Sequence, residues 1–242
     1  MYPNATTKGR QTYLGMVTSM DDFVGTLVDS LKKQGIYENT VIIFSSDNGG
    51  LVDAGGASNL PLKGQKSMLY EGGIRVPGFV HSPNFVKNPG RVHDKLVHIT
   101  DWVPTILRLA TGEEVSLPID GINQYDSIFN DDSESNPRTV MVNELSHDAF
   151  RSFRGAIQME DGWKILRNPD WLPLEDTYFL YNVLDDPNET TDLKEEYPEK
   201  FQDMKNVFME KLQEMVPEDL PLPVPFAKIT DGKGNIITGW CS

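Results

Sequence analysis

The sequence is poor in three features, and each shortage excludes a class of protein. The only cysteine in 242 residues is Cys241, so no disulfide can form within the chain. No run of about 18 apolar residues occurs, so we predict no membrane-spanning helix. Basic residues number 22 against 36 acidic ones, and the net charge of -14 excludes general nucleic-acid binding, which needs a basic surface. No signal peptide is visible, because Met1–Asn4 begins polar.

The composition and the apolar patterning predict an α/β protein with a smaller second unit. A hydrophobic content of 38% over this length is enough for a sizeable core. Apolar residues recur at helical spacing from Arg10 to Gln34, and strand candidates follow at 41–44 and 74–81. Beyond an acidic, serine-rich loop, an Asp161-Gly162 turn favours a hairpin of antiparallel strands. We therefore expect three parts: an α/β domain at residues 1–135, an antiparallel sheet with a helix at 136–216, and an extended proline-rich tail at 217–242.

The rest of the chain is organised around the stretch from Val41 to Gly50. Four apolar residues lead directly into Asp47, Asn48 and two glycines, as at the end of a buried strand of a parallel sheet. In open α/β sheets the ligand crevice lies beyond the carboxyl ends of the strands. A carboxylate and an amide oxygen are hard ligands that suit Ca²⁺ or Mg²⁺. The alternative is an Asn-Gly turn that only ends the strand.

A second stretch, Leu62 to Arg75, follows this loop closely. It reads Leu-Lys-Gly-Gln-Lys and then Tyr-Glu-Gly-Gly-Ile-Arg. Its Lys66 is a compact cation, able to stabilise negative charge that develops on a transferring group. The alternative for any one lysine is an ordinary solvated surface position.

Together, Asp-Asn-Gly-Gly and Lys-Gly-x-Lys with Glu-Gly-Gly closely resemble the sulfatase family, and within it the arylsulfatase B group. The resemblance implies that Asp47 and Asn48 are calcium ligands and that Lys66 contacts the sulfate of the substrate; Lys63 stands where the family tolerates arginine, and no role is transferred to it. Arg-Gly-Ala-Ile at 154–157 and further segments extend the resemblance over nearly the whole chain. The implied fold is alkaline-phosphatase-like: a parallel or mixed central sheet with helices, plus a small C-terminal α+β subdomain with an antiparallel sheet.

Two other polar pairs have plainer interpretations. Asp21 and Asp22 are neighbours within the long predicted helix, where side chains point about 100° apart and cannot readily share one ion. His98 and Asp101 invite comparison with a catalytic dyad. We favour a capping aspartate and a packed histidine before the helix that starts near Trp102.

Half of the expected active site is missing from this sequence. Sulfatases use a formylglycine made from Cys-x-Pro-x-Arg, and no such motif occurs here. The paired aspartates that complete the family's calcium site have no counterpart either, and two oxygen ligands fall short of the six to eight that Ca²⁺ takes. We therefore interpret the chain as the C-terminal portion of an arylsulfatase B-like sulfate ester hydrolase. A truncated gene model, a fragment whose partner is the missing N-terminal half, and a homologue that binds without cleaving remain open.

Further expectations concern substrate, location and alternative functions. The family resemblance implies sulfated sugars, glycosaminoglycans or aryl sulfates as substrates, and a lysosomal or secreted protein. Sequons at Asn4 and Asn188 are compatible with N-glycosylation. A non-catalytic glycan-binding or regulatory protein would use the residual cations Lys63, Lys66 and Arg75. A phosphoesterase is the other enzyme class, but the four histidines do not show the spacing of a two-metal site.

Overall fold

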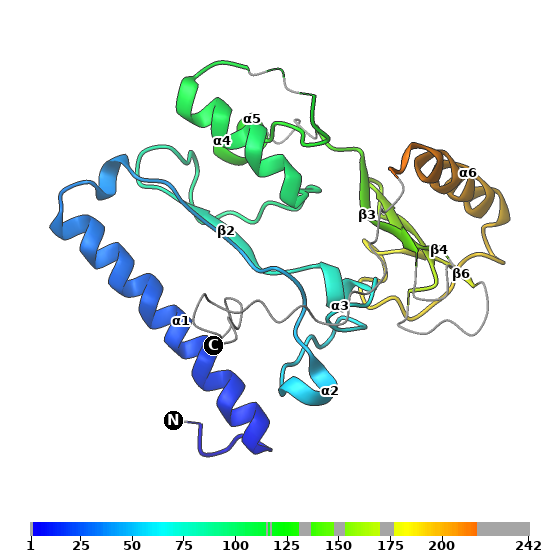
Figure 1. Ribbon diagram of the computed structural model, residues 1–242, viewed down its shortest axis with the longest axis horizontal. Coiled ribbons are helices and arrows are strands. Elements are labelled where there is room, and N and C mark those ends of the chain that lie inside the picture. The colour runs from blue at the N-terminus through cyan, green and yellow to red at the C-terminus, as the bar shows by residue number, and fades with distance from the viewer. Residues whose placement is uncertain are drawn as a thin grey trace, which may run out of the picture.

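The computed structural model describes residues 2–114, 116, 118–130, 137–147, 153–169 and 177–216. The predicted tail at 217–242 lies outside these residues. Figure 1 shows a long helix, a central two-stranded ribbon and a separate four-stranded sheet covered by a helix. In chain order the elements are α1 (Lys8–Lys33), η1 (Tyr37–Asn39), β1 (Ile42–Ser45), α2 (Val52–Gly55), α3 (Glu71–Ile74), β2 (Gly78–His81), η2 (Ile99–Asp101), α4 (Trp102–Thr111), α5 (Tyr125–Phe129), β3 (Val140–His147), β4 (Phe153–Met159), β5 (Trp163–Arg167), β6 (Tyr178–Asn182) and α6 (Pro198–Glu214).

Helix α1 follows the predicted periodicity and begins two residues earlier than expected. The hydroxyl oxygen of Thr7 accepts a hydrogen bond from the amide of Arg10, which satisfies a free donor of the first turn. At the other end Gly35 adopts a left-handed φ of 70° that favours glycine. Local capping chemistry therefore sets both ends of this helix.

The apolar surface of α1 is only partly covered. Val24, Val28 and Leu31 are half-buried, whereas Met16 and Phe23 keep 65% and 66% of their surface exposed. None of the 26 residues of α1 is fully buried. The rest of the described chain therefore covers only part of the apolar surface of this helix.

Strand β1 forms where the apolar run predicts it, and its partner is antiparallel. It pairs with β2, with Ile43 opposite Val80, and the Phe44 and Phe79 rings stack at 5.3 Å between centroids. Among the described residues β1 has no parallel neighbour and no fully buried residue, so the buried parallel strand of the sequence prediction is not seen here. The ribbon lies between α1 and the α4–α5 pair (Figure 1).

The C-terminal sheet and α6 together contain most of the buried hydrophobic residues. The strand order is β3-β4-β5-β6, with every neighbouring pair antiparallel, as the hairpin signals predict. The predicted turn at Asp161-Gly162 joins β4 to β5, and Gly162 has a φ of 88°. Helix α6 covers one face of the sheet (Figure 1), in a cluster formed by Ile157, Ile165, Leu180, Met204 and Phe208. The other face packs against Leu69 and Tyr70, which directly precede α3.

The uneven burial predicts uneven sensitivity to the same small change. Ile165→Val removes one methylene from a fully buried side chain and should lower the free energy of unfolding by about 0.5–1.5 kcal/mol. Ile36→Val makes the same change at a residue that is 52% exposed and should leave this free energy unchanged. Urea denaturation followed by circular dichroism measures both. Equal effects of the two substitutions would contradict the placement of the core.

Within the described part of the chain, none of the helices combines the length and the apolar character needed to cross a bilayer.

Candidate functional site

The loop after β1 presents Asp47 and Asn48 at the molecular surface. Asp47 is exposed and Asn48 is half-buried. The Asp47 carboxylate accepts a hydrogen bond from the Asn48 amide at 2.8 Å, and the Asn48 side-chain nitrogen donates to the Gly49 carbonyl at 2.8 Å. These short-range bonds give the loop a defined shape and leave a carboxylate and an amide oxygen as hard donor atoms.

Two glycines of the second stretch hold this loop against the neighbouring segment. The Gly49 amide donates to the Gly73 carbonyl at 2.8 Å, and the Gly72 amide donates to the Lys63 carbonyl at 2.7 Å. A Cβ atom at Gly49 would overlap the carbonyl oxygen of Gly72. The Gly-Gly pairs thus allow backbone to contact backbone, which no other residue type would permit here.

Asn59 is a further support of the loop that the sequence analysis did not identify. Its side-chain oxygen accepts from the Gly50 amide at 2.9 Å. Its side-chain nitrogen donates to the carbonyls of Gly50 and Gly64, at 2.8 and 3.0 Å. The Asn59 side chain therefore connects the loop that contains Asp47 to the stretch that contains Lys66. The sequence alone does not show this connection, because it depends on how the backbone folds.

Lys66 lies close to the same loop through its backbone. Its amide donates to the Gly50 carbonyl at 3.4 Å, and its side chain is exposed. The preceding residue, Gln65, is buried and accepts from the amides of Val52 and Asp53. In the described part of the chain, the hydrogen bonds between the Asp47 loop and the Lys66 segment are made by backbone groups, and none of them joins the side chains of Asp47 or Asn48 to that of Lys66. The shared pocket for ion and sulfate remains a prediction from the sequence.

Lys63, to which the family resemblance transfers no role, has a different environment from that of Lys66. Its ammonium nitrogen lies 4.1 Å from the centre of the Tyr70 ring and 5.6 Å from that of Tyr181. Burial raises the pKa of Tyr181 far above its ordinary value, so this ring stays neutral. Cation–π contact therefore holds Lys63 on the two tyrosines.

The donor set fits part of a hard-cation site. Asp47 and Asn48 offer oxygen atoms, which suit Ca²⁺. No group of three or more His, Cys, Asp or Glu residues able to hold a metal occurs among the residues that the structure describes. The described part of the chain can therefore supply two ligands, and the remaining ligands would have to come from elsewhere.

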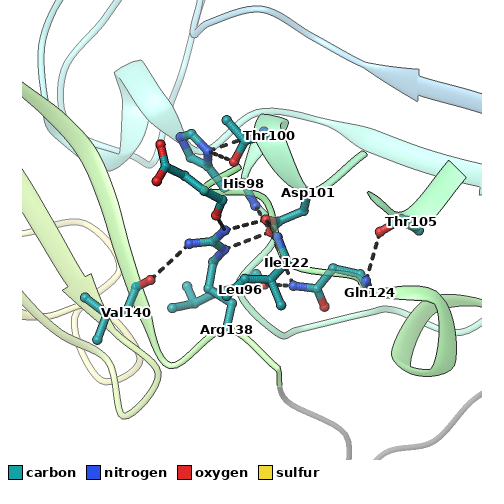
Figure 2. Close-up of polar contacts among 10 residues, drawn as sticks. Leu96, His98, Thr100, Asp101, Thr105, Ile122, Gln124, Arg138 and Val140 are labelled. Atoms are coloured by element: carbon teal, nitrogen blue, oxygen red, sulfur yellow. Dashed lines mark hydrogen bonds and ion pairs between the residues drawn. The ribbon is translucent and has the colours of Figure 1, made fainter. Parts of the chain in front are cut away.

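His98 and Asp101 form a structural cap, as the sequence analysis favoured. Figure 2 shows Asp101 accepting hydrogen bonds from the backbone amides of His98 and Ile122, at 2.9 and 2.8 Å, and from the Arg138 guanidinium, including Nε at 2.8 Å. The His98 ring nitrogen Nδ1 pairs with the hydroxyl of Thr100 at 2.8 Å instead. Burial raises the pKa of Asp101, but hydrogen bonds from Arg138, Ile122 and His98 outweigh it and hold this pKa below its usual value. The pair is therefore no catalytic dyad.

The two sequons lie in different settings. Asn4 is exposed in the N-terminal turn. Asn188 is half-buried, and the Thr190 hydroxyl of its sequon donates to the Asp186 carboxylate at 3.1 Å. Glu189, the residue between Asn188 and Thr190, is fully buried. Glycosylation at either site remains a prediction.

Comparison with known proteins shows which family this chain resembles. The sulfatase family pattern matches residues 2–112. Arylsulfatase J of Mus musculus is 34% identical over 229 aligned residues, which cover 78% of this chain and 38% of that protein.

Solved structures match over most of the chain. Ps i-CgsB, solved in complex with k-i-k-neocarrahexaose, superposes with a TM-score of 0.75 at 34% identity and covers 88% of this chain and 45% of its own. BT4656, solved with its substrate D-glucosamine-2-N,6-O-disulfate, superposes with a TM-score of 0.65 at 23% identity. The match covers 81% of this chain and 39% of the BT4656 chain. At this identity the similarity shows the fold alone. The chain thus spans less than half the length of these relatives. It belongs to the sulfatase family and has the alkaline-phosphatase-like α/β fold of that family.

Proposed function

We propose that this chain forms part of an arylsulfatase-type sulfuric ester hydrolase. The observation that supports it most is the backbone junction of the two loops, in which Gly49 and Gly50 bind Gly73 and Lys66. This junction brings the segment with Asp47 and Asn48 next to the segment with Lys66, as a common site for a cation and an anion requires.

Each residue has a defined part in the proposed reaction. Asp47 and Asn48 would supply oxygen ligands to Ca²⁺, which when bound polarises the sulfate. Lys66 would bind a sulfate oxygen and stabilise the negative charge that grows on the group during transfer. The nucleophile expected in the family is a formylglycine, and the sequence has no Cys-x-Pro-x-Arg motif to provide it. We therefore propose that this chain binds and orients the sulfate but does not by itself supply the attacking group.

The proposed substrates are sulfated sugars, including glycosaminoglycan units, or aryl sulfates. The support is Ps i-CgsB, 34% identical to this chain, whose solved structure contains the oligosaccharide k-i-k-neocarrahexaose, together with the similarity to arylsulfatase J. With a net charge of -14, the chain repels polyanions at long range, so local cations must attract such a substrate. A lysosomal or secreted location is consistent with this substrate class and is part of the proposal.

The missing nucleophile favours a second candidate, a non-catalytic protein that binds sulfated glycans. Both candidates predict sulfate binding through Lys66, and only hydrolysis separates them. An aryl sulfate should not be turned over by the chain alone. Turnover would show that the nucleophile is not a formylglycine and would overturn the proposed mechanism.

Binding of a sulfated disaccharide tests the assignment of Lys66. Lys66→Met should weaken binding at least about 10-fold, because one charged contact to sulfate is lost. Lys8→Met removes an exposed lysine of α1 and should leave binding unchanged. Titration calorimetry in the presence of calcium measures both variants. Equal affinities of the wild type and Lys66→Met would exclude Lys66 from the site.

A further inference from the structure

The two proposed site loops share a support, Glu71. This residue begins α3 and directly precedes Gly72 and Gly73, whose backbone binds Lys63 and Gly49. Figure 1 places α3 between the β1–β2 ribbon and the C-terminal sheet. A shift of Glu71 would therefore move both the Asp47 loop and the Lys66 stretch.

Glu71 is held by two charged residues of the C-terminal sheet and the turn that follows it. The Lys164 ammonium donates to the Glu71 and Glu189 carboxylates, each at 2.8 Å. The second oxygen of Glu189 accepts from the Glu71 backbone amide at 2.6 Å. Lys164 lies on β5 and Glu189 in the turn after β6, and both are fully buried. Arg75 is the other nearby cation, at 3.9 Å from Glu71.

Stability alone gives a poor reason for this arrangement. Three charged groups removed from water lose their hydration, and apolar side chains of similar size often stabilise a core as well or better. Hydrogen bonds to the charged groups, in contrast, fix direction. Lys164 and Glu189 bind both the side chain and the backbone amide of Glu71, so they set the position and the orientation of α3.

We propose that Lys164 and Glu189 are positioning residues for the loops that carry Asp47, Asn48 and Lys66. The C-terminal sheet, through this buried ion cluster, would then determine how well the site binds its cation and anion. The inference rests on the proposed function for the identity of the ligands. The mechanical link through Glu71 can be tested separately.

The test uses the double variant Lys164→Met/Glu189→Gln, which leaves the net charge of the cluster unchanged. The matched control, Lys200→Met/Asp161→Asn, makes the same kinds of change at an exposed pair 3.3 Å apart. Hydrogen exchange should become at least about 10-fold faster at the amides of Gly49 and Gly72 in the test variant alone. This factor should exceed any change at amides of the central strands, such as those of Ile165 and Leu180, whose exchange reports the global stability.

A second readout is the affinity for Tb³⁺, a luminescent substitute for calcium. The test variant should bind it about 10- to 100-fold more weakly than the wild type, as is typical when partners behind metal ligands are removed. Unchanged exchange at Gly49 and Gly72 would overturn the proposal. Faster exchange with an unchanged Tb³⁺ affinity would do so too, because the cluster would then have a structural role alone.

Two further variants keep the outcomes separate. Asp47→Asn should abolish Tb³⁺ binding; if it does not, the proposed metal site fails, while the exchange data still decide on the positioning link. Glu189→Gln alone keeps the size of the side chain and an acceptor for the Glu71 amide. It should give smaller changes in the same direction, and it replaces the double variant if that protein does not fold. No change at Gly49 or Gly72 in a folded Glu189→Gln variant would also count against the proposal.

Discussion

Replacing Lys164 by methionine should lower the free energy of unfolding by about 3–5 kcal/mol, because two buried carboxylates lose their common counter-ion. Glu71 and Glu189 would remain at 3% and 0% exposure, with no ammonium between them. Chemical denaturation of the wild type and the variant measures this difference. Lys200→Met, which removes a partly exposed ammonium near Asp161, should leave the unfolding midpoint unchanged.

The defect of Lys164→Met should also depend on pH. Burial raises the pKa of Glu189, and Lys164 opposes this rise. Without the lysine, the folded-state pKa of Glu189 moves further above its unfolded value of about 4.3. When the pKa of a carboxyl is raised in the folded state, the free energy of unfolding falls as the pH rises from the unfolded pKa through the folded one. The defect should therefore be larger at pH 7 than at pH 5, and a defect that grows on acidification would contradict the role of Lys164 as counter-ion.

Replacing Arg138 by methionine should cost a similar amount, about 3–5 kcal/mol, because it leaves the Asp101 carboxylate buried without its counter-ion. Asp101 is 0% exposed and binds the guanidinium through both carboxylate oxygens (Figure 2). Arg138 also donates to the Val140 and Asp120 carbonyls, at 3.2 and 3.0 Å. Thermal and denaturant unfolding of the variant measure the loss.

The double variant Arg138→Met/Asp101→Asn is the control for this prediction. It removes both charges and should be more stable than Arg138→Met, because no isolated buried charge remains.

The contribution of Asp101 to the stability of the wild type depends on pH with the opposite sign to that of Glu189. Because the folded-state pKa of Asp101 is depressed, its stabilisation is present above the unfolded pKa of about 3.9 and is lost as the pH falls further. A double variant no more stable than Arg138→Met would show that buried charge is not the cause of the loss.

The elements that could be predicted were those encoded by neighbouring residues. Thr7 and Gly35 mark the ends of α1, since caps act within one helical turn. The Asp161-Gly162 turn sets the β4–β5 hairpin, because a tight turn leaves little freedom of register. Such local rules could not predict which strand pairs with β1 or in which direction, because strand pairing joins residues far apart in sequence.

The candidate site was predicted only in part, for the same reason. Asp47, Asn48 and Lys66 belong to short motifs that can be recognised in the sequence. The roles of Asn59, Lys164 and Arg138 could not be read from any motif, because they depend on partners up to 93 residues away. A single lysine in a strand predicts a solvated side chain, and Lys164 departs from this because two carboxylates surround it.

The sequence by itself determined the family, the order of the strands and of the longer helices, and the residue types available to bind a cation and a sulfate. Periodicity, caps, turns and short motifs act between near neighbours, so they can be followed along a chain. Only the tertiary structure decided which charges are buried, that Glu71 connects the C-terminal sheet to the site loops, and that Asp101 is a cap held by Arg138. Burial and ion pairing depend on how distant segments pack, because the surrounding atoms decide whether a charge keeps its water.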